Sequence, residues 1–326
     1  MSLQHNPESV YGTGEVLSDG RTDWRKEKLR STAVSEVMPT EKRQERMGEC
    51  STFLEFSVDS VGAKKLKRAN FCKDRMCPAC QRRRSLKVFH QIKRSCTALL
   101  QERPTAQFMM LTLTVPNVHK DDLDKTLKHM FKSWTRLIDR AEFKKAVLGW
   151  FRSLEITKEK RDRVDYYHPH FHVLIAVPAH YFKTKVYIKQ SRWLELWQES
   201  TKQPEITQVD IRRVKSKNND SENSDIKSAA AEVGKYATKP GDYIHKYEDS
   251  YIADESIVSV LSEVLKNKRI IAFGGALKSY LSDRENKDHE DDSSENLVHV
   301  GDDSPEIEAV MTRIFRWHSS HRNYIG

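Results

Sequence analysis

Residues 168–177 read His-Pro-His-Phe-His-Val-Leu-Ile-Ala-Val, and this stretch decides the fold. The five apolar residues after the last histidine predict a buried β-strand. Side chains two apart on a strand share a face, so His170 and His172 can reach one metal ion while Phe171 turns into the core. Imidazole is the commonest ligand of transition metals. The stretch therefore indicates either a metal site at the mouth of a strand or two exposed histidines that merely end it.

The segments around this strand alternate between strand and helix patterns. Strands are expected at 108–115, 150–157, 171–177 and 206–214, with the charged residues 158–165 as a hairpin turn. Helices are expected at 122–140, 189–199, 225–238 and 257–265, and partly at 270–280. This order is typical of an α+β fold, in which a central antiparallel β-sheet has helices packed on one side.

Glu155 lies on the strand that precedes the histidines, among the residues Ser-Leu-Glu-Ile-Thr at 153–157. Across the predicted hairpin it is well placed to be a third ligand beside His170 and His172. Two histidines and one glutamate leave coordination positions open for a substrate oxygen and water, as a catalytic metal site requires. The alternative is a glutamate on the solvent face of the hairpin.

The bulk charge points to a polyanionic partner. The 326 residues carry a net charge of +9, but residues 283–308 hold eleven acids and two bases, which leaves +18 on the remainder. Such a balance favours nucleic acid over a membrane surface as the partner. The chain has no apolar run of about 20 residues and no signal peptide, so we expect a cytoplasmic protein without membrane contact.

Composition divides the chain into five parts. We expect a mostly disordered basic arm at 1–48, a Cys-rich zinc module with a basic helix at 49–104, the sheet domain at 105–282, an acidic linker at 283–306 and a C-terminal tail at 307–326. The tail regains apolar character and can dock back onto the body.

Four of the five cysteines have the spacing of a structural zinc site. Cys77 and Cys80 form a tight Cys-x2-Cys knuckle, Cys72 lies five residues earlier, and Cys50 lies a hairpin's length upstream. Four thiolates suit tetrahedral Zn²⁺. The alternative is a set of scattered buried cysteines, although the surroundings are polar for a core. Cys96 lies on an apolar helix face and is expected in the core.

Basic residues surround the knuckle and can neutralise several phosphates. The candidate DNA-binding residues are Arg75, Arg82, Arg83, Arg84 and Lys87. A solvated helix face is the alternative for this run.

Residues 232–236 read Glu-Val-Gly-Lys-Tyr on the predicted helix 225–238. Residues four apart share a helix face, so Glu232 and Tyr236 point the same way, with Lys235 and Lys239 close by. A tyrosine hydroxyl is a nucleophile, and nearby cations lower its pKa. The alternative is that this tyrosine is an ordinary surface residue.

Four motifs together carry a resemblance that none carries alone. They are FCKDRMCPAC at 71–80, LTLTVPN at 111–117, HPHFHVL at 168–174 and EVGKY at 232–236. In this order they resemble the HUH endonuclease superfamily, and within it the plasmid rolling-circle replication initiators (Rep proteins) of small Gram-positive plasmids. The resemblance runs from about Cys50 to Tyr280. It implies that residues 105–282 form a HUH nuclease domain for nicking and strand transfer.

The resemblance implies a site- and strand-specific DNA endonuclease. Initiators of this kind bind a double-strand origin and nick one strand, so Tyr236 would become linked to the 5′ phosphate and leave a 3′-hydroxyl primer. A divalent ion, Mn²⁺ or Mg²⁺, would be held by His170, His172 and Glu155, with Mn²⁺ favoured by the imidazoles. His168 would orient one of these ligands.

The resemblance also implies the single-tyrosine type. Some relatives carry a second tyrosine one turn from the first, but here position 232 is glutamate and position 240 is proline. Glu232 would activate water for the second cleavage that ends replication. Tyr243 lies beyond the helix end and is not expected to be a second nucleophile.

The implied partners are plasmid origin DNA, as duplex and as a single-stranded nick site, and the host helicase and replication machinery. A homodimer is compatible with the sequence. Three alternatives stay open: a HUH transposase, a mobilisation relaxase, and a zinc-module DNA-binding regulator without activity.

Overall fold

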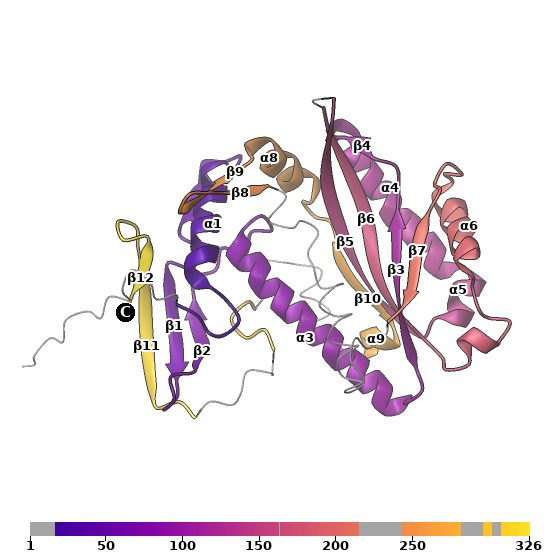
Figure 1. The fold of residues 1–326 in the computed structure, drawn as a ribbon, viewed down its shortest axis with the longest axis horizontal. Helices are drawn as coiled ribbons and strands as arrows, with labels where there is room; N and C mark the ends of the chain where they lie inside the picture. Colours follow the sequence, from indigo (N-terminus) through magenta and orange to yellow (C-terminus); the bar gives the residue numbers. More distant parts are fainter. Residues whose placement is uncertain (1–16, 163, 215–242, 282–295, 302–307) are drawn as a thin grey trace, which may run out of the picture. The chain divides into compact units, whose positions relative to one another are not determined.

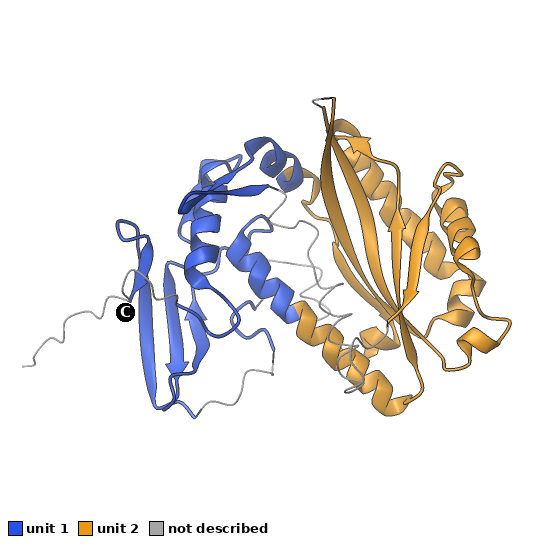
Figure 2. Ribbon diagram, in the orientation of Figure 1, with its two compact units in different colours: residues 1–87, 243–262, 292–326 blue, residues 88–242, 263–291 orange. Residues whose placement is uncertain are grey.

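The computed structural model describes residues 17–162, 164–214, 243–281, 296–301 and 308–326. The chain forms two compact units (Figure 2): unit 1 comprises residues 1–87, 243–262 and 292–326, and unit 2 comprises residues 88–242 and 263–291. Their boundaries differ from those of the five parts expected from composition. Within the described ranges no helix is long and apolar enough to cross a membrane.

A six-stranded antiparallel sheet forms the centre of unit 2 (Figure 1). Its order is β10-β5-β6-β3-β7, and β4 also pairs with β6. The strands are β3 (Gln107–Thr114), β4 (Val118–His119), β5 (Gly149–Arg161), β6 (Val164–Val177), β7 (Val209–Arg213) and β10 (Ile271–Gly275). The structure therefore has the mixed α+β architecture with antiparallel pairing that the sequence predicts.

The predicted hairpin forms, but its strands are longer than expected. β5 and β6 pair from Gly149 opposite Ala176 to Arg161 opposite Val164, so the charged stretch 158–165 is mostly strand. Pro169 lies inside β6, where a missing N–H would break a sheet ladder. The registers of β6 with β3 and β4 skip residues 168 and 169, so the proline lies where those ladders are interrupted.

Helices pack on both faces of this sheet, so the expectation of helices on one side is wrong. The helices of unit 2 are α4 (Lys120–Asp139), α5 (Ala141–Ala146), α6 (Gln190–Thr201), α9 (Ala276–Ser279), the later turns of α3 (Pro78–Glu102) and the short 3-10 helix η1 (Tyr181–Lys183). Trp134 of α4 and Trp197 of α6 contact Phe171 on one face. On the other face Cys96 and other apolar residues of α3 share a core with Leu174, which confirms Cys96 as a core residue.

The segment 270–280 is a strand followed by one helical turn rather than a partial helix. β10 pairs with β5, and the Trp150 ring lies so close to Gly274 that a Cβ there would be 2.2 Å from a ring carbon. Glycine is thus required for the two strands to approach. The bounds of the other predicted helices agree with α4, α6 and α8 (Glu255–Val264) to within two residues, except for the segment 225–238, which lies outside the described residues.

Unit 1 is built on a four-stranded sheet of order β12-β11-β1-β2. Its strands are β1 (Phe53–Val58), β2 (Lys64–Ala69), β11 (Met311–His318) and β12 (Asn323–Ile325), and the hairpin β8 (Ile244–Tyr247) and β9 (Ser250–Ala253) belongs to the same unit. Trp24, Leu54, Phe56 and Phe315 are fully buried in its core. The apolar C-terminal tail thus forms β11, which pairs with β1, and β12, which pairs with β11.

The N-terminal segment corrects the sequence-based expectation of a mostly disordered arm. Within residues 17–48, α1 (Trp24–Glu36) and α2 (Glu41–Gly48) are helical, because α1 buries Trp24 in the unit 1 core. Part of the expected acidic linker is also ordered against this unit. Leu297 and Val300 are buried, and the Arg83 guanidinium donates to the Leu297 carbonyl oxygen at 2.9 Å.

Candidate metal centres

The first centre lies where β5 and β6 pair. Glu155 is directly opposite His170, and Ser153 is opposite His172, so period-two alternation places both imidazoles and the carboxylate on one face. Glu155 is only 2% exposed, which contradicts the alternative of a solvent-facing glutamate. The three side chains form one of two groups in the described residues whose ligand atoms lie within 4.8 Å of one another.

The geometry of this group suits a divalent ion. The Nε2 atoms of His170 and His172 lie 2.9 and 2.5 Å from the same Oε2 of Glu155. Neighbouring ligands of an octahedral ion with bonds of about 2.1 Å lie about 3.0 Å apart, close to these separations. The histidine side chains keep 12% and 18% of their surface exposed, so the centre has an open side.

The outer nitrogens of both imidazoles have partners that aim Nε2 at the centre. His170 Nδ1 lies 3.2 Å from the backbone carbonyl oxygen of His168, and His172 Nδ1 lies 3.5 Å from Thr112 Oγ1. A proton on Nδ1 leaves Nε2 as the ligand atom, which is the usual arrangement at metal sites. The contact of His168 that orients His170 is thus made by the His168 backbone carbonyl and not by its ring. Burial lowers the pKa of the His168 ring.

Phe171, between the two histidines, fixes the strand from its other face. Its ring lies 5.5 Å from that of Phe131, and the buried guanidinium of Arg152 lies 4.5 Å from its centroid. Burial lowers the pKa of Arg152 to about 9. This packing fixes the position of β6 and therefore limits how far the imidazoles of His170 and His172 on its other face can move.

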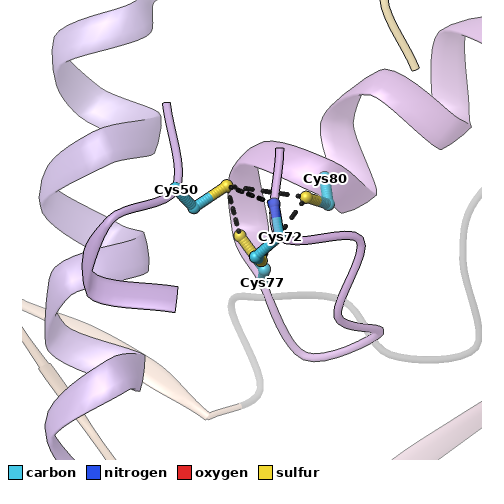
Figure 3. A group of neighbouring side chains, drawn as sticks. All are labelled: Cys50, Cys72, Cys77 and Cys80. Atoms are coloured by element: carbon cyan, nitrogen blue, oxygen red, sulfur yellow. Dashed lines mark hydrogen bonds between the residues drawn. The ribbon is translucent and has the colours of Figure 1, made fainter. Parts of the chain in front are cut away.

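The second centre is the four-cysteine group of unit 1 (Figure 3). The Sγ atom of Cys50 lies 3.6 Å from that of Cys80 and 3.5 Å from that of Cys77, and the Sγ atoms of Cys72 and Cys80 are 3.7 Å apart. Four thiolates around Zn²⁺ with bonds of about 2.3 Å lie about 3.8 Å apart. The four thiols are free and buried, so the cluster has the dimensions of a tetrahedral zinc site rather than of disulfides.

Backbone amides point at the sulfur atoms of this centre. The Cys72 N–H donates to Cys50 Sγ at 3.4 Å, and the Lys73 N–H donates to Cys80 Sγ at 3.2 Å. Lys73, which follows Cys72, has φ 58°, in the left-handed region that a side chain disfavours, and this backbone turn directs its N–H at the Cys80 sulfur. Hydrogen bonds to sulfur stabilise thiolates, the form that binds metal.

Helix α1 supplies further contacts that the sequence did not reveal. Ser31 Oγ lies 3.4 Å from Cys77 Sγ, and Lys28 Nζ donates to the Cys50 carbonyl oxygen at 3.0 Å. Burial raises the pKa of Cys77, but hydrogen bonds from the neighbouring thiols and Ser31 outweigh it, and the pKa is well below its ordinary value. These polar residues follow no apolar periodicity, so no local sequence pattern marks them as contacts of the cysteine centre.

The basic run next to the knuckle is only partly accessible. Arg83, Arg84 and Lys87 are buried, and the Arg84 guanidinium donates to the Asp74 carbonyl oxygen at 3.1 Å. The predicted phosphate contacts of Arg83, Arg84 and Lys87 are therefore corrected. Arg83 and Arg84 donate hydrogen bonds to backbone carbonyls of unit 1, and the Lys87 side chain is buried. Arg75 and Arg82 are half-buried and remain candidates.

The predicted nucleophile and its neighbours lie outside the described residues. These are Glu232, Lys235, Tyr236 and Lys239. Tyr243 is described; it is fully buried and its hydroxyl donates to the Met76 carbonyl oxygen at 3.2 Å.

Comparison with known proteins places the chain in a family. A family model described as replication protein matches residues 63–325. The chain belongs to this replication protein family. This Rep protein is 34% identical to a Protein rep of Bacillus amyloliquefaciens over 94% of each chain. It is 32% identical to one of Streptococcus pneumoniae, over 93% of this chain and 91% of the relative.

A third relative, a Protein rep of a Bacillus species, is 35% identical over 87% of this Rep protein and 94% of its own length. No solved structure matches it. With a family model and three relatives that cover most of the chain, it is a plasmid Rep replication protein.

Proposed function

We propose that the protein initiates rolling-circle replication by nicking plasmid origin DNA in the bacterial cytoplasm, with Tyr236 as the nucleophile. The observation that carries the proposal is the convergence of His170 and His172 Nε2 on one carboxylate oxygen of Glu155, in a member of the replication protein family. Two imidazoles and a carboxylate with an open side are the ligand set of a catalytic rather than a structural metal.

The proposed reaction exchanges one phosphodiester bond for another. The Tyr236 oxygen attacks the scissile phosphorus, the bond from phosphorus to the 3′ oxygen breaks, and that oxygen takes up a proton to become the 3′-hydroxyl primer. Glu232 later activates water, whose oxygen attacks the phosphorus of the regenerated nick site, and the bond from that phosphorus to its 3′ oxygen breaks in this second cleavage. The 3′-hydroxyl that is released then attacks the phosphate on Tyr236 and closes the strand, and the tyrosine oxygen leaves and takes up a proton. The HUH type and both residue roles belong to this proposal.

Glu155, His170 and His172 would hold Mn²⁺ or Mg²⁺, and two imidazoles favour Mn²⁺. When bound, such an ion stabilises the negative charge that develops on the phosphate. The His168 carbonyl and Thr112 keep the imidazoles in the ligand-donating tautomer before DNA arrives.

The four-cysteine centre would hold a structural Zn²⁺, because sulfur separations of 3.5 to 3.7 Å fit its tetrahedron. The proposed DNA contacts include Arg75, Arg82, Lys235 and Lys239. The host helicase, the replication machinery and a second copy of the chain are further proposed partners.

Incubation with a supercoiled plasmid carrying the origin, in Mn²⁺, tests the proposal. Wild type should convert it to open circles and should become covalently attached to the 5′ end of the nicked strand, which a denaturing gel detects. Tyr236→Phe should bind the origin but neither nick nor attach. Tyr243→Phe is the matched control and should nick if it folds normally. Equal nicking by Tyr236→Phe and wild type would refute the assignment.

A further inference from the structure

The unit 1 sheet has an inner face in the core and an outer face that carries cations. Leu54 and Phe56 of β1 point inward, so Phe53, Glu55 and Ser57 lie on the opposite face. The registers add β11 and β2 residues to this outer face: Arg316 is opposite Phe53, and Arg68 is opposite Glu55. Lys65 pairs with Ser57 and lies on the same face.

A β-bulge places two consecutive cations on this face. The register of β2 shifts between Glu55 and Phe56, so Lys67 is an extra residue beside Arg68. Both reach the same carboxylate, since Lys67 Nζ lies 3.5 Å and Arg68 3.4 Å from Glu55 oxygens. Glu55 is buried, whereas the side chains of Lys67 and Arg68 are 53% and 71% exposed, so the solvent-accessible charge at this point of the face is positive.

Phe53 holds guanidinium groups from the two neighbouring strands. The Arg68 guanidinium lies 5.8 Å and the Arg316 guanidinium 5.4 Å from its ring centroid. Arginine stacked on an aromatic ring loses less conformational freedom when it binds a ligand, and its planar fork matches a phosphate. The ring itself is engaged by these cations rather than open to a nucleotide base.

We infer that this outer face, defined by Lys65, Lys67, Arg68 and Arg316 around Phe53, binds the sugar-phosphate backbone of duplex DNA. The inference rests on the proposed function, which requires the protein to hold an origin, and it assigns a surface to that contact. Charge complementarity selects the occupant: this face carries four cations and one carboxylate, and two of the cations, Lys67 and Arg68, already pair with that carboxylate. Contacts of this kind position a duplex and do not read its sequence.

The test compares an Arg68→Ala, Arg316→Ala double variant with wild type by fluorescence anisotropy on an origin duplex. We expect duplex affinity to fall at least about tenfold at fixed salt, and the slope of log affinity against log salt to shrink by about two. A Lys125→Ala, Lys132→Ala variant removes two exposed cations from α4 and should bind the duplex like wild type.

Three outcomes overturn the inference: unchanged duplex affinity of the Arg68 and Arg316 variant, an equal loss in the α4 control, or a loss confined to single-stranded DNA. Arg68→Gln, Arg316→Gln repeats the measurement with the packing of the long side chains retained. Nicking of a short single-stranded oligonucleotide should be unchanged in these variants. If wild type does not nick DNA but the Arg68 and Arg316 variants still lose duplex affinity, the proposed nicking function is refuted while the assignment of this face to duplex binding is supported.

Discussion

At the scale of single residues, Glu155 controls the first metal centre. Glu155→Gln keeps the side-chain length but removes the charge on which both imidazoles converge. We expect Mn²⁺ affinity to fall more than about tenfold, since even changes outside the ligand shell cost that much. Isothermal titration with Mn²⁺ measures the change directly, without DNA.

Glu159→Gln is the matched control for this prediction. Glu159 lies on the same strand and the same face as Glu155, but its side chain is exposed and pairs with Arg161 at 2.7 Å. It should leave Mn²⁺ affinity unchanged. Wild-type affinity in Glu155→Gln would rule out the centre as the Mn²⁺ site.

Much of this site could be predicted because β-structure repeats every two residues. The spacing of His170 and His172 and the hairpin with Glu155 fix which side chains share a face. The alternation Leu-Thr-Leu-Thr puts Thr112 on one face of β3, but it does not show that this face is the one that carries the histidines. Thr112 was missed because its contact with His172 depends on β3 lying beside β6 in the sheet. Order within a sheet depends on contacts distant in sequence, and a local pattern does not encode them.

At the scale of elements, α4 is tied to the segment before β10 by Asp124. Its carboxylate accepts hydrogen bonds at 2.6 Å from Lys128 and from Lys268, and these lower its pKa below the ordinary 3.8. A carboxyl group with a lowered folded pKa stabilises the fold above that ordinary value and loses the effect as pH falls through the folded value. The side chain is 41% exposed, so water screens the pairs.

Asp124→Asn should therefore lower the free energy of unfolding at pH 7 by less than about 1 kcal/mol. Urea denaturation of variant and wild type measures the difference, which should shrink at 1 M salt and vanish near pH 2. Asp122→Asn, on the exposed first turn of α4, shows whether any change comes from the helix dipole instead. A difference that persists at pH 2 would contradict the ion-pair explanation.

Helix α1 shows why some elements escape sequence-based prediction. Its buried face includes Glu27, Lys28, Ser31 and Ser35, so apolar residues do not recur with helical spacing. Lys28 and Ser31 are buried because they contact the cysteine centre, and Ser31 Oγ accepts the Ala79 N–H at 3.2 Å. A helix that packs on a metal site needs polar atoms on its buried face. A prediction based on hydrophobicity assigns such polar residues to the solvent-exposed face.

At the scale of the whole molecule, two separate cores predict two separate responses to zinc removal. The cysteine centre and α1 belong to unit 1, whereas α4 packs in unit 2. Chelation of the proposed zinc should abolish amide hydrogen-exchange protection across residues 24–36 and leave that of 120–139 within about twofold. Mass spectrometry of peptides from both segments gives the two readouts in one experiment.

The fifth cysteine provides the control for this experiment. Cys96 lies in the unit 2 core outside the cluster, so Cys96→Ala should keep the zinc content and the response of α1 to chelation. Cys80→Ser should lower both before chelator is added. Retained protection of 24–36 in metal-free protein would show that α1 does not depend on the centre.

The order of the unit 1 sheet has a consequence for how the chain is made. β11 lies between β12 and β1, so a strand that begins at residue 311 covers an edge of β1, which is synthesised much earlier (the yellow and purple strands in Figure 1). A ribosome that has reached residue 291 has already delivered every residue of unit 2, while β1 still has an unpaired edge. A message cut short between residues 291 and 311 therefore yields every residue of unit 2, with the Glu155 centre, but not a closed unit 1. Its product carries an open strand edge that invites aggregation.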